Sequence, residues 1–79
     1  MATKTKIQTP TDLGLAIRRQ RKAGGLTLSD VAGLTNVGIR FLSELANGKP
    51  TVRLDKLLHV TQALGLELQI ISPADLNQE

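Results

Sequence analysis

The segment from Leu26 to Lys49 constrains the fold more than any other part of the chain, because it specifies two short helices joined by a tight turn. Thr27 followed three residues later by Asp30 is a capping signal that starts a helix over about residues 28–35. Ala32 in this helix is expected to be buried. A small side chain there allows the next helix to cross closely.

The second helix of the segment is predicted over about residues 38–46. Asn36, which tolerates a positive φ, suits the turn before it, and Asn47-Gly48 suits its C-terminal end. Three apolar side chains of this helix share one face by their helical spacing: Phe41, Leu42 and Leu45. Two helices that cross at such a turn form a helix-turn-helix, which presents its second helix to the major groove of DNA.

Two further helices flank this motif. Thr9 as N-cap and Pro10 at the first helical position start one of them, and Gly24-Gly25 ends it. The other runs from about residue 53 to residue 64, with leucines on one face. The predicted fold is therefore mainly α, a compact domain of four to five helices that follows a flexible N-terminal arm over residues 1–8.

The period of the apolar residues changes from helical to alternating after Gly65, which predicts a half-buried β-strand over residues 66–72. Its candidate dimerisation residues are Leu66, Leu68, Ile70 and Ile71. A single strand leaves backbone groups unpaired along both edges, and no other stretch of the chain is a convincing partner. Antiparallel pairing with the same strand of a second subunit predicts a homodimer, in preference to a strand docked on its own subunit. The domain then covers residues 9–72, and residues 73–79 form a mobile tail.

A net charge of +3 favours a polyanionic partner. The basic residues lie in the arm, in the first helix and around the motif, where they can form a phosphate-binding surface: Lys4, Lys6, Arg18, Arg19, Arg21, Lys22, Arg40, Lys49 and Arg53. The alternative for the run 18–22 is a solvated helix face. The chain has no cysteine and one aromatic residue, so disulfides and aromatic stacking on single strands are not expected. It also has no apolar run that predicts a membrane span or a secretion signal.

Groups that could perform catalysis are scarce. His59 is the sole histidine and stands between apolar residues on a helix, and no glycine-rich phosphate loop is present. Asp30 and Asp55 are explained by positions in the first turns of helices. The chain is therefore not expected to be an enzyme, and no catalytic residue, cofactor or metal ligand is assigned.

The second motif helix offers the candidate base contacts. With Gly38 as its N-cap, the residues that project away from the core are Ile39, Arg40, Ser43 and Glu44. The guanidinium fork of Arg40 matches guanine O6 and N7, and Ile39 suits a thymine methyl group. Two interpretations of Glu44 stay open, an acceptor for a cytosine amino group and an i,i+4 ion pair with Arg40.

Phosphate contacts are expected from groups that surround this helix. Peptide N–H groups near its start and the side chains of Lys49 and Arg53 are suited to them. Thr27 and Ser29 at the start of the preceding helix add hydroxyl groups and the positive end of a helix dipole.

The run from Leu13 through Leu68 resembles the Cro/repressor-type (Xre) helix-turn-helix domain. A closer similarity, to the HipB-type antitoxins of bacterial toxin–antitoxin operons, rests on RFLSELANGKPTVRLDKLLHVTQALGLEL. The resemblance implies a homodimer on a palindromic operator, with an intermolecular sheet of C-terminal strands, and a HipA-like Ser/Thr kinase toxin as partner. It also implies which residues meet DNA: bases at Gly38, Ile39, Arg40, Ser43 and Glu44, and phosphates at Lys49 and Arg53.

Three departures from the family pattern affect these expectations. Leu28 stands where many members carry a phosphate-binding glutamine, so Ser29 is expected to replace that contact. Ala46 stands where many carry an acid that pairs with an arginine of the first helix, so Arg21 is expected to bind phosphate or Glu44 instead. The tail has no tryptophan, which argues against contact with a toxin through the tail.

Two other functions remain open beside the antitoxin. One is a free-standing Xre-type transcriptional or phage-like repressor without a toxin partner. The other is a helical protein-interaction module without DNA binding, against which the basic residues at the ends of the second motif helix argue. The resemblance implies a location in the bacterial cytoplasm, associated with the nucleoid.

Overall fold

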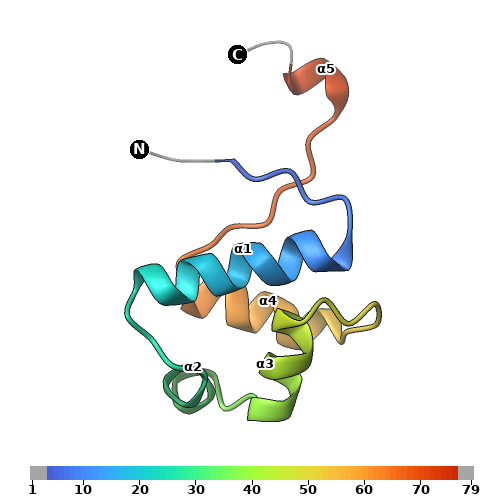
Figure 1. Ribbon diagram of the computed structural model, residues 1–79. Coiled ribbons are helices and arrows are strands. Elements are labelled where there is room, and N and C mark those ends of the chain that lie inside the picture. The colour runs from blue at the N-terminus through green and yellow to red at the C-terminus, as the bar shows by residue number, and fades with distance from the viewer. Residues whose placement is uncertain (1–3, 77–79) are drawn as a thin grey trace.

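The computed structural model describes residues 4–76, and all the regular structure in that range is helical. The helices are α1 (Pro10–Ala23), α2 (Leu28–Thr35), α3 (Ile39–Ala46), α4 (Leu54–Ala63) and the single turn α5 (Pro73–Leu76) (Figure 1). α3 packs against α1 and α2, and α4 packs against α2. The predicted α domain is confirmed, and the ends of the four long helices lie within about two residues of those expected.

Local capping explains where α1 and α2 begin. The Thr9 hydroxyl accepts a hydrogen bond from the Asp12 backbone N–H at 3.1 Å, and the Thr27 hydroxyl accepts one from the Asp30 N–H at 3.0 Å. Each aspartate carboxylate accepts in return from the N-cap backbone, which completes a capping box. The N–H of Gln8 is the main group that lowers the pKa of Asp12, and the N–H of Thr27 is the main one for Asp30.

The turn between α2 and α3 depends on Asn36 and on a buried hydroxyl. Asn36 has a φ of 58°, which confirms the prediction for this turn. Thr35 is only 4% exposed. Its hydroxyl donates to the Val31 carbonyl at 2.7 Å and accepts from the Val37 N–H at 3.2 Å. The hydroxyl therefore fixes the path from α2 into α3, a role that was not predicted from the sequence.

The core lies between the four long helices. Its buried apolar side chains are Ile17, Val31, Val37, Leu42, Leu45, Leu57, Val60 and Leu64. The inward direction predicted for Leu42 and Leu45 is confirmed, because they are only 3% and 2% exposed. Phe41 is half-buried and packs against this core, so all three apolar side chains predicted to share a face of α3 contact the core.

The predicted site of close helix crossing is wrong in part. Ala32 is half-buried rather than buried, and it packs against the edge of the core. A close backbone approach instead involves Gly14 on α1. A Cβ atom built on Gly14 would lie 2.6 Å from the carbonyl oxygen of Leu45 and 2.7 Å from that of Ala46. The end of α3 therefore rests directly on the backbone of α1.

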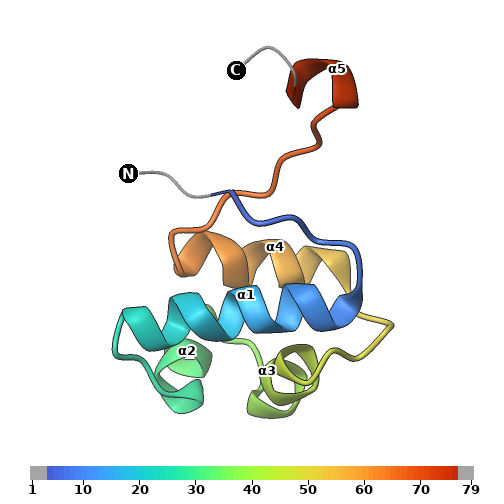
Figure 2. The ribbon, with the colours of Figure 1, turned by 45° about the horizontal axis from the view of Figure 1, so that its top comes forward.

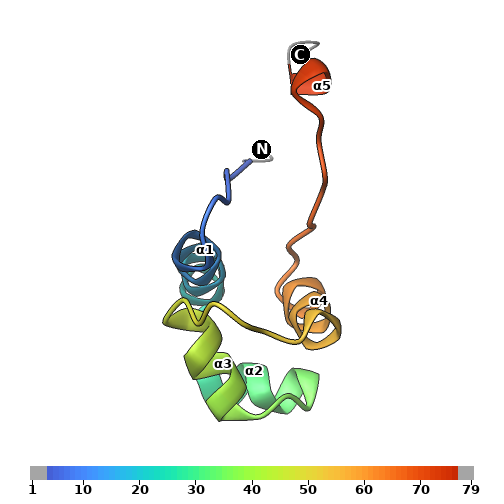
Figure 3. The same ribbon diagram turned by 90° about the vertical axis from the view of Figure 1, so that its right-hand side faces the viewer.

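The strand predicted over residues 66–72 is absent from the described part of the chain. This segment has no regular secondary structure there, because its backbone does not pair with another strand. Leu66 packs against the core of its own chain, and its N–H donates to the Thr61 carbonyl at 2.8 Å. Beyond Leu66 the segment leaves the helices, and Figure 3 shows it well apart from the N-terminal segment. Since a strand needs a neighbour to supply backbone partners, alternation alone does not produce one within a single chain.

Residues 73–76, at the start of the expected tail, form a single helical turn. Pro73 begins the helical turn α5, because proline suits the first position of a helix. Residues 77–79 of the expected tail, and residues 1–3 of the expected arm, lie outside the described residues. None of the helices within residues 4–76 is long and apolar enough to span a membrane.

Candidate nucleic-acid interface

α2 and α3 lie together at one end of the molecule, and the C-terminal segment leaves from the other (Figures 1 and 2). α3 begins at Gly38, whose extended backbone (φ −62°, ψ 146°) is that of an N-cap without a side-chain hydrogen bond. The first turn of α3 carries Ile39, which is 49% exposed, and Arg40, whose side chain is 93% exposed. An uncapped helix start with two exposed side chains is free to meet a ligand.

The second turn of α3 is less open. Ser43 and Glu44 are both half-buried, so they project outward less fully than the sequence analysis expected. Glu44 lies between two cations, with Oε2 2.9 Å from the Lys49 Nζ and Oε1 3.9 Å from the Arg40 Nε. The Lys49 ammonium is the main group that lowers the pKa of Glu44. The i,i+4 pair with Arg40, one of the two interpretations of Glu44, is therefore present in the free protein, but Lys49 is the closer partner.

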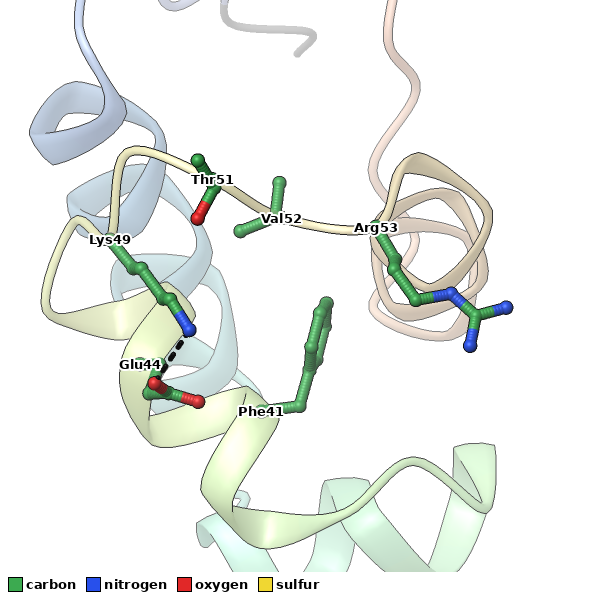
Figure 4. A pocket seen from close by; sticks show the side chains of 6 residues that line it. All are labelled: Phe41, Glu44, Lys49, Thr51, Val52 and Arg53. Atoms are coloured by element: carbon green, nitrogen blue, oxygen red, sulfur yellow. Dashed lines mark hydrogen bonds and ion pairs between the residues drawn. The ribbon is translucent and has the colours of Figure 1, made fainter.

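The loop between α3 and α4 borders a surface depression of about 340 Å³. It is lined by Phe41, Glu44, Lys49, Thr51, Val52 and Arg53 (Figure 4). Phe41 points into the space between α3 and α4, and the Lys56 ammonium lies 5.5 Å from the centre of its ring. Phe41 therefore lies at the edge of the core.

The two cations of this loop are held on different sides of the depression. The Lys49 side chain turns toward Glu44, whereas the Arg53 guanidinium points away from both (Figure 4). Arg53 forms a two-pronged pair with Asp55, with Nε to Oδ1 at 3.1 Å and Nη2 to Oδ2 at 2.6 Å. Arg53 is also the main cause of the lowered pKa of Asp55. This pair was not predicted, because the place of Asp55 in the first turn of a helix already accounts for it and a spacing of two residues from Arg53 gives no sign of a contact.

The start of α2 places Thr27 and Ser29 on the surface. The Thr27 oxygen accepts the N–H of Asp30, and a hydroxyl that accepts one bond still has its own proton to donate. Leu28, which stands where many family members carry glutamine, is half-buried and packs against the core. Its apolar side chain therefore contributes packing at this position.

Arg21 has a structural partner. Its Nη1 donates to the Leu26 carbonyl at 2.5 Å, across the connection from α1 to α2. Gln20 beside it donates from Nε2 to the Leu64 carbonyl at 3.0 Å and thereby joins α1 to the end of α4. Neither bond was anticipated, because both depend on how the helices dock.

The other basic residues of the expected surface lie outside α2 and α3. Lys4 and Lys6 are exposed in the segment that precedes α1, at the end of the molecule away from α2 and α3 (Figure 1). Arg18, Arg19 and Lys22 are exposed on α1 itself, as a solvated helix face would be. Within residues 4–76, no three His, Asp or Glu side chains are grouped so that they could hold a metal ion.

Replacing Arg21 with methionine is expected to lower the free energy of unfolding by about 1–2 kcal/mol, because a half-buried, charge-assisted hydrogen bond is lost while the aliphatic packing is kept. Urea denaturation measures the change. Arg18→Met is the matched control, since Arg18 is exposed on the same helix and its loss should cost less than about 0.5 kcal/mol. Unchanged stability together with weakened duplex binding would instead assign Arg21 to phosphate.

Comparison with known proteins agrees with this arrangement. A helix-turn-helix domain family matches residues 12–69. An uncharacterized HTH-type transcriptional regulator of Sinorhizobium fredii, y4mF, is 40% identical over 70 residues, which cover 89% of this chain and 92% of the regulator.

Two solved proteins share the fold. HipB, in the HipB–O4 20mer complex and in the HipA–HipB–O2–O3 complex, has a TM-score of 0.80 at 24% identity, covering 89% of this chain and 99% of HipB. The clp gene regulator ClgR from C. glutamicum has a TM-score of 0.66 at 34% identity, covering 78% of this chain and 80% of ClgR. The chain therefore belongs to the helix-turn-helix family of DNA-binding transcriptional regulators, of the Cro/repressor (Xre) type and with a HipB-like fold.

Proposed function

We propose that the protein is a sequence-specific repressor that binds a palindromic operator in duplex DNA as a homodimer. The observation that carries this proposal is the start of α3, where Arg40 is almost fully exposed beside an uncapped helix end. A guanidinium in that position can reach guanine O6 and N7 in the major groove.

The base contacts proposed are those of Ile39, Arg40 and Ser43, with the Gly38 backbone at the entrance of the helix and Glu44 one turn further on. The phosphate contacts proposed are those of Thr27, Ser29, Lys49 and Arg53, which surround the start and the end of the motif. Arg21 contributes to phosphate binding only with donors that its bond to Leu26 leaves unused.

The C-terminal segment supports the homodimer. Leu68 is 45% exposed and Ile70 is fully exposed, although both are apolar. Ile71 is half-buried, and Leu66 anchors the segment to its own core. Antiparallel pairing of two such segments covers the exposed side chains and satisfies backbone groups. The segment lies on the side of the molecule away from α2 and α3, so pairing there leaves both motifs open to a two-fold site (Figure 3).

We propose a HipA-like kinase toxin as the protein partner, which makes the chain an antitoxin that represses its own operon in the bacterial cytoplasm. The HipB-like fold supports this, because HipB occurs in a complex with HipA. The alternative is a repressor without a toxin, which is supported by similarity to ClgR, described as a gene regulator.

The homodimer is tested with Ile70→Asp. Sedimentation at micromolar concentration should show wild-type dimers and mostly monomeric variant, because the aspartate places charge between the paired strands. Affinity for an operator selected from random duplexes should fall about tenfold or more, since each half-site then binds alone. Leu15→Asp is the control, because Leu15 is 50% exposed on α1, outside both the segment and the proposed DNA contacts. A dimeric Ile70→Asp variant would contradict the proposed interface.

The toxin partner is tested by affinity purification of the tagged chain from its source cell, with and without nuclease. A kinase that remains bound after nuclease treatment supports the antitoxin. Partners that depend on DNA throughout favour the repressor without a toxin. Duplex binding that is insensitive to salt would contradict DNA recognition itself, because phosphate contacts release counterions.

A further inference from the structure

Lys49 is tied to Glu44 by two bonds. Its ammonium lies 2.9 Å from the Glu44 carboxylate, and its backbone N–H donates to the Glu44 carbonyl at 3.0 Å. The second bond closes the end of α3, where Gly48 adopts a φ of 79°. The side-chain pair therefore starts from a fixed backbone geometry (Figure 4). At 46% and 36% side-chain exposure, both groups are accessible to a ligand.

This pair presents a conflict for DNA binding. A lysine that neutralises a carboxylate is not available in full to a phosphate, and a carboxylate without its lysine is repelled by the phosphate backbone. Arg53 is in the same situation with Asp55. The two acids differ in position, because Glu44 lies on α3 and Asp55 lies in the first turn of α4. On the proposed docking, only Glu44 enters the groove.

We propose that Glu44 and Lys49 exchange partners on the correct operator, and that this exchange makes Glu44 a specificity-determining residue. In the free protein Lys49 neutralises Glu44. On the operator, the Glu44 carboxylate accepts a hydrogen bond from a base amino group, cytosine N4 or adenine N6, and Lys49 is released to a phosphate. The proposal rests on the DNA-binding function proposed above.

The exchange discriminates because the amino group is present only at the right base. Non-specific binding is driven by phosphates. On non-specific DNA, release of Lys49 would leave the Glu44 charge uncompensated beside the phosphates. The Glu44–Lys49 ion pair therefore stays intact, and Lys49 makes no phosphate contact. On the operator, the base amino group replaces Lys49, and the phosphate contact is gained. Glu44 thus couples a base contact made from α3 to a phosphate contact made from the loop that follows α3.

The test compares Glu44→Gln with Asp55→Asn, since each removes one negative charge from one cation. Affinity is measured over a range of salt for a duplex selected by the wild-type protein and for a scrambled duplex of equal composition. Glu44→Gln should strengthen binding of the scrambled duplex about fivefold and steepen its salt slope by about 1, because Lys49 becomes available. Binding of the selected duplex should change less than twofold, because a glutamine oxygen still accepts the amino proton.

Asp55→Asn should strengthen binding to both duplexes by the same factor, because Asp55 contacts no base in either complex. A second background, Lys49→Gln, should abolish the effect of Glu44→Gln on the scrambled duplex, because the lysine to be released is gone. The proposed exchange is overturned if Glu44→Gln changes the affinities for both duplexes by the same factor. It is also overturned if the effect of Glu44→Gln on the scrambled duplex persists in the Lys49→Gln background. Failure of the wild-type protein to bind any duplex would instead remove the proposed function, so the two failures are distinguishable.

Discussion

Replacing Gly14 with alanine is expected to lower the free energy of unfolding by about 3 kcal/mol, a large part of the stability of so small a domain. The added Cβ would lie 2.6 Å from the Leu45 carbonyl oxygen and 2.7 Å from the Ala46 carbonyl oxygen. Both contacts are with backbone, so no side-chain rotation relieves them and α1 must separate from α3. Calorimetry should show the midpoint falling by roughly 10–20 °C.

Gly33→Ala is the matched control. Gly33 also lies within a helix, α2, but nothing stands within 4 Å of the position of its Cβ. The substitution should raise stability by about 0.5–1 kcal/mol, because alanine loses less conformational entropy than glycine on forming a helix. If Gly14→Ala also unfolded at or above the wild-type midpoint, the close approach of α1 and α3 would be wrong.

Replacing Arg40 with alanine is expected to weaken binding to the selected operator by roughly 10- to 100-fold, which corresponds to the 1–3 kcal/mol of a bidentate guanine contact. Binding to a scrambled duplex should fall by no more than about threefold, since only one charge is lost. The side chain is 93% exposed, so the fold should be unaffected. Fluorescence anisotropy with both duplexes measures the two affinities.

Two variants separate the shape of Arg40 from its charge. Arg40→Lys retains the charge without the planar fork, so it should lose nearly as much operator affinity as the alanine variant. Arg19→Ala removes an equal charge from the exposed face of α1, and it should weaken binding to both duplexes slightly and by the same factor. An Arg40→Ala variant that loses the same factor on both duplexes would place Arg40 on a phosphate instead of a base.

The helices were predictable because their signals are local. Thr9 and Thr27 each stand three residues before the aspartate that completes the capping box, and the structure has both boxes. Asn36 was predictable for the same reason, because its preference for a positive φ belongs to the residue itself. The apolar spacing of α3 also sufficed to predict that Leu42 and Leu45 point inward.

The C-terminal segment shows where such reasoning fails. Alternation in residues 66–72 predicts an apolar face and a polar face, yet Leu68 and Ile70 of the apolar face are both exposed in this chain. The alternation of side chains does not specify which other strand would form hydrogen bonds with the backbone. In the described part of the chain this segment forms no β-sheet. Leu66 was assigned to a dimer interface, yet it packs against its own core because it directly follows the end of α4.

The four helices, their caps, the turn at Asn36 and the exposed start of α3 were all predictable, since they depend on residues within about one helical turn of each other. Other contacts became visible only in the folded chain: α3 rests on Gly14, Gln20 donates to Leu64, and Lys49 and Arg53 turn toward Glu44 and Asp55 respectively. Docking and cap geometry set these contacts. A side chain's available partners depend on the backbone positions around it, which no local pattern specifies.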